Sequence, residues 1–267
     1  MLSLVCPLCQ QPLQAEDRQW RCNAGHNFDQ ARQGYLNLLP VQHKRSRQPG
    51  DTPGMLDCRQ AFLDAGHYLP VSERINQLLQ QGQPHQLLDI GCGEGWYSAR
   101  LQQALPDTGM AGLDISKEAI LRACRRSRQI QWLVGSSARL PVADASVDAL
   151  LCVFSPWFAG ECRRVLRPGG RLLLVGPHED HLLSLRQRLY DRVNPTPDLL
   201  GELPEGFGIV SDELLRYPLS LPATDLANLI GMTPHSFRSH PERQQALIES
   251  GLADLQVAMR LLLLQRH

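Results

Sequence analysis

Short apolar runs alternate with amphipathic stretches along most of the chain. The apolar runs read as strands at residues 86–90, 109–115, 130–135, 147–153 and 171–176. Helical patterns occur at residues 59–82, 96–105 and 117–128, and a further short helix ends at residue 164. Strands that alternate with helices at this spacing form a parallel sheet covered on both faces. The pattern therefore predicts an α/β fold.

The two ends of the chain depart from this alternation. Residues 214–221 and 253–265 read as strands around two helices, and we expect them to form an antiparallel pair that completes the sheet. The N-terminal part lacks the pattern. We therefore divide the chain into an N-terminal module at 1–43, a linker at 44–55 and an α/β domain at 56–267.

Three cysteines and a histidine in the N-terminal module have the spacing of a metal site. Cys6, Cys9, Cys22 and His26 form the pattern C-x2-C-x12-C-x3-H. Two such turns let four donors converge on one Zn²⁺, and a site filled by four protein ligands is structural rather than catalytic. A thioredoxin-like redox pair is the alternative, but it lacks a βαβ context and leaves Cys22 and His26 unexplained.

Composition is that of a globular protein, which we expect to be cytoplasmic and without a membrane partner. Hydrophobic residues make up 43% of the 267 residues, charged residues make up 20%, and the formal net charge is zero. No apolar run reaches the ~20 residues of a membrane span, and the N-terminus lacks the pattern of a signal peptide. The other five cysteines are scattered singly, so we expect them to be reduced and mostly buried.

Charge is divided unevenly along the chain. Residues 1–50 hold six Lys and Arg against three Asp and Glu, whereas the remainder holds 21 against 24. Residues 43–47, here called the basic strap, contribute His43, Lys44, Arg45 and Arg47. A short charge run is often a solvated linker. Beside a zinc module it also fits contacts to RNA phosphates, because Lys and Arg displace condensed counterions.

Residues 87–98, LLDIGCGEGWYS, place three glycines directly behind the first predicted strand of the α/β domain. Gly91, Gly93 and Gly95 lie where a strand turns into its helix, the edge at which open α/β sheets bind ligands. A tight turn alone needs fewer glycines. Dinucleotide enzymes favour G-x-G-x-x-G, but Trp96 occupies the place of its last glycine. The spacing D-x-G-x-G-x-G resembles motif I of class I S-adenosylmethionine-dependent methyltransferases.

Asp114 is the candidate partner of this motif. It ends the next strand, 19 residues after Gly95, where it could accept hydrogen bonds from both hydroxyls of a ribose. Alternatively, Asp114 could cap the following helix, a role for which Ser116 is also available. Residues 135–141 and 164–175 also resemble methyltransferase motifs. Together these matches predict a Rossmann-like class I methyltransferase fold with a small N-terminal zinc-binding domain.

Four segments then resemble one family from end to end: CPLC-x12-C-x3-H, GYLNLLPVQHKRSRQPGD, RQAFLDAGHY and LLDIGCGEGWY. In this order they are similar to the RlmA family of 23S ribosomal RNA guanine-N1 methyltransferases. The resemblance implies a zinc domain that grips an rRNA hairpin and methyl transfer from S-adenosylmethionine to N1 of a hairpin-loop guanine. It also implies a homodimer. The HKRSR stretch is more similar to the Gram-negative branch, the guanine-745 type.

The resemblance also implies site residues, carried over by position. The zinc ligands would be the four donors named above. The cofactor contacts would be Tyr68, Gly91, Gly93, Glu94, Gly95, Asp114 and His181. Tyr68 could instead be a core aromatic residue, and His181 could cap a helix.

The residues that handle the base are expected at the end of the fourth strand. Phe154-Ser155-Pro156-Trp157 stands where amino-directed methyltransferases carry N/D-P-P-Y/F/W, but it has Ser for the first residue and only one Pro. We predict that a flipped guanine stacks on Trp157, with a core tryptophan as the alternative. Guanine N1 must also lose a proton. The polar groups near by are Glu94, Ser155, His178, Glu179 and Asp180, and the sequence favours none of them as the base.

Two other functions fit parts of the sequence. Motif I alone would allow a small-molecule methyltransferase, against which the zinc module and the basic strap argue. A non-catalytic zinc-ribbon RNA-binding protein would explain the N-terminal module. Against that reading, the glycine motif and Asp114 are intact.

Overall fold

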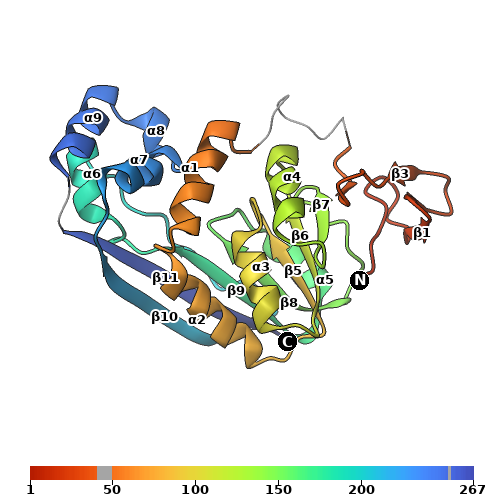
Figure 1. The fold of residues 1–267 in the computed structure, drawn as a ribbon. Coiled ribbons are helices and arrows are strands. Elements are labelled where there is room, and N and C mark those ends of the chain that lie inside the picture. Colours follow the sequence, from red (N-terminus) through yellow and green to blue (C-terminus); the bar gives the residue numbers. More distant parts are fainter. Residues whose placement is uncertain (41–49, 252–253) are drawn as a thin grey trace.

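The computed structural model describes residues 1–40, 50–251 and 254–267, and its centre is an eight-stranded sheet with helices on both faces (Figure 1). The strand order is β10-β11-β9-β8-β5-β6-β7-β4. The strands are β4 (Leu36–Asn37), β5 (Gln86–Ile90), β6 (Gly109–Asp114), β7 (Gln131–Val134), β8 (Val147–Val153), β9 (Leu166–Pro177), β10 (Phe207–Leu219) and β11 (Leu255–Arg266). Strands β4 to β9 pair in parallel, whereas β11 runs antiparallel to both β9 and β10. The predicted α/β fold and its antiparallel pair are confirmed.

Helices connect most of these strands. They are α1 (Pro53–Asp64), α2 (Leu69–Gln80), α3 (Trp96–Ala104), α4 (Lys117–Arg126), α5 (Ala159–Val165), α6 (Leu183–Leu189), α7 (Ala223–Gly231), α8 (His235–Arg238) and α9 (Pro241–Ser250). The first five correspond to predicted helices. Helix α6 has no predicted counterpart, and the described residues between β10 and β11 hold three helices instead of two, because α8 is a single short turn.

The sheet separates two buried clusters. Successive residues of a strand point to opposite faces, so Leu87 and Leu88 of β5 belong to different clusters. On one face the cluster includes Phe62 of α1 and Leu226 of α7. On the other face the sheet packs against α5 and against apolar residues of the N-terminal module, including Trp20. Burial on both faces explains why the strands read as continuous apolar runs.

The N-terminal module is joined to the α/β domain along two lines. Its own small sheet consists of β1 (Gln14–Glu16), β2 (Gln19–Arg21) and β3 (Asn27–Asp29). Strand β4 then leaves the module and extends the main sheet beside β7. At the other line, Val5 N donates to Pro141 O at 3.1 Å and Ala143 N donates to Ser3 O at 2.9 Å. The module is therefore packed on the domain. The sequence did not predict this arrangement, because a strand of two residues shows no periodicity.

The predicted boundary at residue 43 lies outside the described residues. Helix α1 begins at Pro53, three residues before the predicted start of the α/β domain at 56. Thr52 caps it by accepting a hydrogen bond from Met55 N at 3.3 Å, and Pro53 occupies a first-turn position where no N–H is needed. Both are sequence signals for a helix start.

Helices α1, α6, α7, α8 and α9 gather at one end of the sheet (Figure 1). Helix α1 packs on α7, and α9 packs on α6 and α7. The turn after α1 is tied to α7 by the pair between His67 Nε2 and Asp225 Oδ2, at 2.7 Å. None of the described helices is long and apolar enough to cross a membrane.

Candidate active site

The four predicted metal ligands converge on one point of the N-terminal module. Their ligand atoms all lie within 4.8 Å of one another. His26 Nδ1 is 3.5 Å from Cys6 Sγ and 3.4 Å from Cys22 Sγ, and Cys9 Sγ is 3.6 Å from Cys22 Sγ. Tetrahedral bonds of about 2.3 Å to sulfur and about 2.0 Å to nitrogen require edges of roughly 3.5 to 3.8 Å. The donor set therefore fits a four-coordinate zinc ion.

Each pair of ligands sits on a tight turn closed by the backbone. Gln10 N donates to Cys6 O at 2.8 Å, and Gly25 N donates to Cys22 O at 2.9 Å. Burial raises the pKa of the Cys6 thiol. At Cys22 desolvation also acts upward, but hydrogen bonds from His26 and Cys9 outweigh it and lower the pKa to about 6. A thiol that ionises this readily is suited to metal binding.

The three glycines of the loop between β5 and α3 share a left-handed backbone, but each has a different neighbour. Their φ angles are +73° at Gly91, +56° at Gly93 and +79° at Gly95, values that favour glycine. A Cβ on Gly91 would lie 1.9 Å from Ser155 Oγ, and one on Gly95 would lie 2.6 Å from Trp132 Cη2. Packing alone thus requires these two glycines. At Gly93 the nearest atom to such a Cβ is Arg59 Nη1 at 3.6 Å, so this position leaves the backbone accessible.

Asp114 lies directly against the glycine loop. Its Oδ2 accepts from Gly93 N at 2.9 Å, and its Oδ1 accepts from Ser116 N at 2.7 Å. Ser116, rather than Asp114, caps helix α4, because its hydroxyl accepts from Ala119 N. Burial raises the pKa of Asp114, while the two backbone N–H groups oppose this shift. Two backbone N–H groups thus hold the carboxylate beside the loop, at the place expected for ribose binding.

Glu94 of the glycine loop is buried beside a basic side chain. It is 2% exposed, and its Oε1 lies 3.9 Å from Arg126 Nη2. Burial raises the pKa of Glu94. Among the described residues these two atoms have no hydrogen-bond partner. Buried polar atoms are seldom left unpaired, so this pair fits a site that takes up a further polar group.

Arg59 of α1 lies beside the glycine loop, although no sequence motif predicts it there. Its guanidinium stands next to Gly93, pairs with Asp51 and reaches Met232 O at 3.4 Å. Gly50 packs so closely on the start of α4 that a Cβ there would lie 2.9 Å from Ser116 Cβ. A lone arginine in a helical pattern carries no motif, and only the packing of α1 brings it to the loop.

An aromatic group of three side chains lies at the same edge of the sheet. Tyr68 is 3% exposed, and its hydroxyl is 3.4 Å from His181 Nε2. His181 Nδ1 accepts from Ala258 N at 3.3 Å. Burial lowers the pKa of His181 to about 3, so this ring is neutral. The third ring is that of Phe154, which was not among the predicted site residues. Its centroid lies 6.4 Å from the centroids of the Tyr68 and His181 rings.

Trp157, the predicted stacking residue, makes contacts of its own within the protein. It is half-buried and packs on the apolar cluster that contains α5. Its indole N–H donates to Leu199 O at 3.4 Å. These contacts favour the alternative of a tryptophan that stabilises the core.

The other polar candidates are dispersed around this edge. His178, Glu179 and Asp180 follow β9 and hold their ligand atoms within 4.8 Å of one another. Asp180 pairs with Arg216 of β10. Ser155 lies against Gly91, as described above. The basic strap residues His43, Lys44, Arg45 and Arg47 lie outside the described residues.

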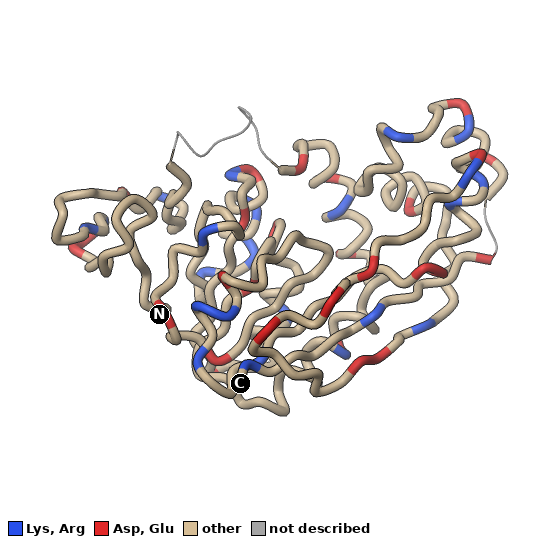
Figure 2. The backbone as a smooth tube through the Cα atoms, turned by 180° about the vertical axis from the view of Figure 1, so that it is seen from behind, with Lys and Arg blue, Asp and Glu red and all other residues tan. Residues whose placement is uncertain are grey.

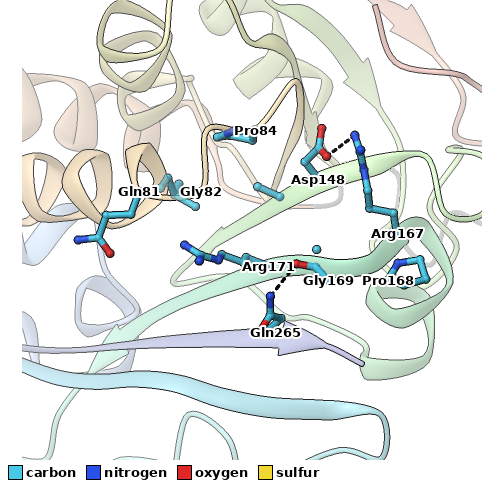
Figure 3. Close-up of a pocket in the computed structure, with 12 residues that line it drawn as sticks. Gln81, Gly82, Pro84, Asp148, Arg167, Pro168, Gly169, Arg171 and Gln265 are labelled. Carbon is cyan, nitrogen blue, oxygen red and sulfur yellow. Dashed lines mark hydrogen bonds and ion pairs between the residues drawn. The ribbon is translucent and has the colours of Figure 1, made fainter.

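A hollow of about 250 Å³ lies at the opposite end of the sheet (Figure 3). It is lined by residues 79–84 before β5, by the first residues of β8 and β9 and by Gln265 of β11, and there Asp148 pairs with Arg167. Open α/β sheets bind ligands at the carboxyl ends of their strands. The glycine loop, Asp114 and Phe154 all lie at those carboxyl ends, so the hollow is separate from the candidate site.

Of the five scattered cysteines, four are buried and Cys58 is half-buried, as expected.

Acidic and basic residues stand side by side along β10 and β11 at the far edge of the sheet (Figure 2). There Arg260 pairs with Asp212 at 2.8 Å, and Arg74 of α2 pairs with Glu213 at 2.7 Å. This edge is therefore not a one-signed basic surface.

Comparisons with known proteins agree with this arrangement. Residues 4–47 match the family described as the N-terminal domain of RlmA, and residues 87–170 match a methyltransferase domain family. The 23S rRNA (guanine(748)-N(1))-methyltransferase of Streptomyces fradiae is 38% identical over 247 residues, which cover 90% of this chain and 87% of the relative. A Micromonospora griseorubida protein, provisionally named 23S rRNA (guanine-N(1)-)-methyltransferase, is 37% identical over 92% of this chain and 90% of its own.

Among solved structures, the plantazolicin methyltransferase BpumL is 16% identical, covers 81% of this chain and 92% of its own, and superposes with a TM-score of 0.48. The family assignment rests instead on the two sequence relatives, whose matches cover 90% and 92% of this chain. The chain belongs to the family of RlmA-type 23S rRNA guanine-N1 methyltransferases.

Proposed function

We propose that this protein transfers a methyl group from S-adenosylmethionine to N1 of a hairpin-loop guanine in 23S ribosomal RNA. The observation that carries the proposal is the hydrogen bond between Gly93 N and Asp114 Oδ2, at 2.9 Å. It sets the carboxylate of Asp114, which we expect to bind the ribose, against an accessible backbone at the carboxyl edge of the sheet. A metal-ligand cluster on the same polypeptide, packed against the domain, supplies the second part of such an enzyme.

The residues around the glycine loop fit the cofactor. Asp114 would accept from the ribose hydroxyls, and the backbone at Gly91, Gly93 and Gly95 would line the cofactor. Glu94 would use its unpaired oxygen, and Tyr68 and His181 would close the site from the aromatic side. When bound, S-adenosylmethionine supplies a sulfonium with an excellent leaving group. The protein then contributes mainly positioning of the nucleophile and exclusion of water.

Arg59 adds a charge that matches the amino-acid end of the cofactor. Its guanidinium lies beside Gly93, where it could form a bidentate pair with a carboxylate. In this structure the carboxylate of Asp51 forms an ion pair with that guanidinium. We therefore expect the cofactor carboxylate and Asp51 to compete for Arg59.

The zinc ion would be structural. Cys6, Cys9, Cys22 and His26 fill a tetrahedral set, so zinc would hold the ribbon folded and would not touch the methyl group. The ribbon and the basic strap would together contact the rRNA hairpin, because phosphates bind Lys and Arg and single-stranded loops expose their bases. We further expect a cytoplasmic homodimer, which sedimentation of the purified protein would test.

Primer extension on 23S rRNA tests the proposal, since a methyl on guanine N1 blocks pairing and stops reverse transcriptase. A strain that lacks the protein should lose one stop, and the wild-type gene, but not an Asp114→Ala variant, should restore it. The position of the stop also decides between the guanine-745 type that the strap resembles and the guanine 748 of the Streptomyces relative.

A tritium-transfer assay with purified protein separates the alternatives. Label in cell metabolites but not in rRNA would indicate a small-molecule methyltransferase. Failure to bind S-adenosylmethionine in calorimetry would indicate a non-catalytic RNA-binding protein.

A further inference from the structure

We propose that Phe154, and not Trp157, is the side chain on which the target base stacks. The proposal rests on the proposed function, since it concerns how that site holds its RNA base. It is carried by the position of Phe154, by the exposure of its ring and by its backbone conformation.

The position of Phe154 brings it next to the glycine loop. It follows the last residue of β8, at the carboxyl edge of the sheet, and its N–H donates to Val175 O at 2.9 Å. The next residue, Ser155, lies so close to Gly91 that a Cβ there would be 1.9 Å from Ser155 Oγ. Residues 154 and 155 therefore border the loop that would hold the methyl donor.

The ring of Phe154 is only partly covered. It neighbours the rings of Tyr68 and His181, with interplanar angles of 30° and 33° and centroid distances of 6.4 Å. Tyr68 is buried and His181 is half-buried, whereas Phe154 is 47% exposed. A fixed aromatic ring with open surface is what an unstacked base needs. Stacking of this kind changes affinity roughly 5- to 150-fold when the aromatic side chain is removed.

The backbone of Phe154 is strained. Its φ is +53°, in the left-handed region that bulky side chains rarely adopt. An exposed phenylalanine adds little to the core, so neither burial nor backbone preference explains this residue at this position. Strained residues persist only where the surrounding structure holds them, and they are concentrated at functional sites. Here the hydrogen bond to Val175 O and the contact between Ser155 and Gly91 hold the turn that presents the ring.

Trp157 and Phe158 provide contrasts in the same segment. Trp157 packs on an apolar cluster and uses its indole N–H on Leu199 O. Phe158 is 46% exposed, nearly the same as Phe154, but its φ is an ordinary −128° and it precedes helix α5. Phe158→Ala is therefore a matched control for the loss of an exposed phenyl ring.

The test measures steady-state methylation of an rRNA hairpin and, separately, calorimetric binding of S-adenosylmethionine. For Phe154→Ala we expect kcat/KM for RNA to fall roughly 5- to 150-fold, with the cofactor Kd unchanged within about twofold. Phe154→Tyr, which keeps the ring, should restore most of the rate. Phe158→Ala should leave both quantities unchanged.

Phe154→Gly separates function from folding. Glycine accepts the left-handed backbone that alanine resists, so this variant should melt a few degrees above Phe154→Ala while losing as much activity. If Phe154→Ala methylates RNA at the wild-type rate, or if its main defect is in cofactor binding, the proposal is overturned. If the wild-type protein itself does not methylate rRNA, the proposed function fails instead.

Discussion

Asp114 and Gly93, 21 residues apart in the chain, are joined by a hydrogen bond of 2.9 Å from the backbone nitrogen to the carboxylate. The bond crosses from the end of β6 to the loop after β5, which are neighbouring parallel strands. It fixes the glycine loop and holds the acid in place at once. For substitutions at Asp114, cofactor binding and the stability of the fold should therefore be measured separately.

Replacing Asp114 with Asn keeps the shape of the side chain but removes its charge and one acceptor. Each lost hydrogen bond to a charged group is worth about 1.5–3 kcal/mol, so the Kd for S-adenosylmethionine should rise roughly 10- to 150-fold. Calorimetry at constant pH measures this. The matched control is Ser116→Ala, which loses the cap of α4 and should lower the melting temperature without a comparable change in Kd.

Arg59 and Asp51 should show effects of opposite sign. Arg59→Ala removes the guanidinium beside Gly93, and we expect cofactor affinity to fall about 10-fold. Asp51→Asn frees Arg59 from its present partner, and cofactor affinity should rise slightly. Binding titrations of both variants decide the matter, and a loss of affinity in Asp51→Asn would contradict the competition that we propose.

Removal of the metal should loosen the N-terminal module. Its ligands Cys6 and Cys22 belong to the same buried cluster as Trp20 and the sheet residue Leu133. Chelation of bound zinc should therefore lower the melting temperature by several degrees and shift tryptophan emission to the red. Cys22→Ser should reproduce the effect. Cys58→Ser, which changes a half-buried thiol outside the cluster, serves as the control.

Asp89 should make the protein less stable as pH rises. Burial raises its pKa to about 7, although a hydrogen bond from Ser98 Oγ at 2.5 Å favours the ionised form. Between pH 5 and pH 8 the Asp89 carboxyl of the unfolded chain is already ionised. The same carboxyl in the folded chain loses its proton within this interval. Stability should therefore fall by roughly 2–3 kcal/mol across that interval because of this group.

Urea unfolding of the wild type and of Asp89→Asn at several pH values isolates the effect of Asp89. The carboxylates of Asp114 and Glu94 have pKa values shifted in the same direction, but they are common to both proteins, so the difference retains only Asp89 and its repulsion with Asp114. From pH 5 to pH 8 the free energy of unfolding of the wild type should fall relative to that of Asp89→Asn. A difference that stays constant with pH would show that Asp89 does not titrate in this range.

The basic strap should contribute to the salt dependence of RNA binding. Changing Lys44, Arg45 and Arg47 together to Ala removes three positive charges. Each phosphate contact to a single strand contributes about 0.7 to the slope of log K against log salt, so the slope should flatten by about 2. Filter binding at several salt concentrations measures the slope, and an unchanged slope would identify the strap as a solvated linker.

Periodicity and spacing in the sequence were sufficient for the fold and for the local parts of the site. The strands and helices follow from apolar runs, and the four metal ligands follow from two tight turns whose geometry is set within a few residues. Motif I predicted the glycine loop, and the length of one helix and one strand placed Asp114 at the same edge. These features are local, or follow from the regular geometry of a parallel sheet.

Only the tertiary structure decided which side chains share the site and which serve the core. Arg59 reaches Gly93 because α1 packs across the sheet edge, and no motif marks it. Phe154 and Trp157 are equally aromatic in the sequence, yet one ring is left exposed on a strained turn and the other is packed on an apolar cluster. Gly91 and Gly95 are required by Ser155 and Trp132, residues 64 and 37 positions away. Contacts between residues so distant in the chain arise from packing, which the order of residues does not display.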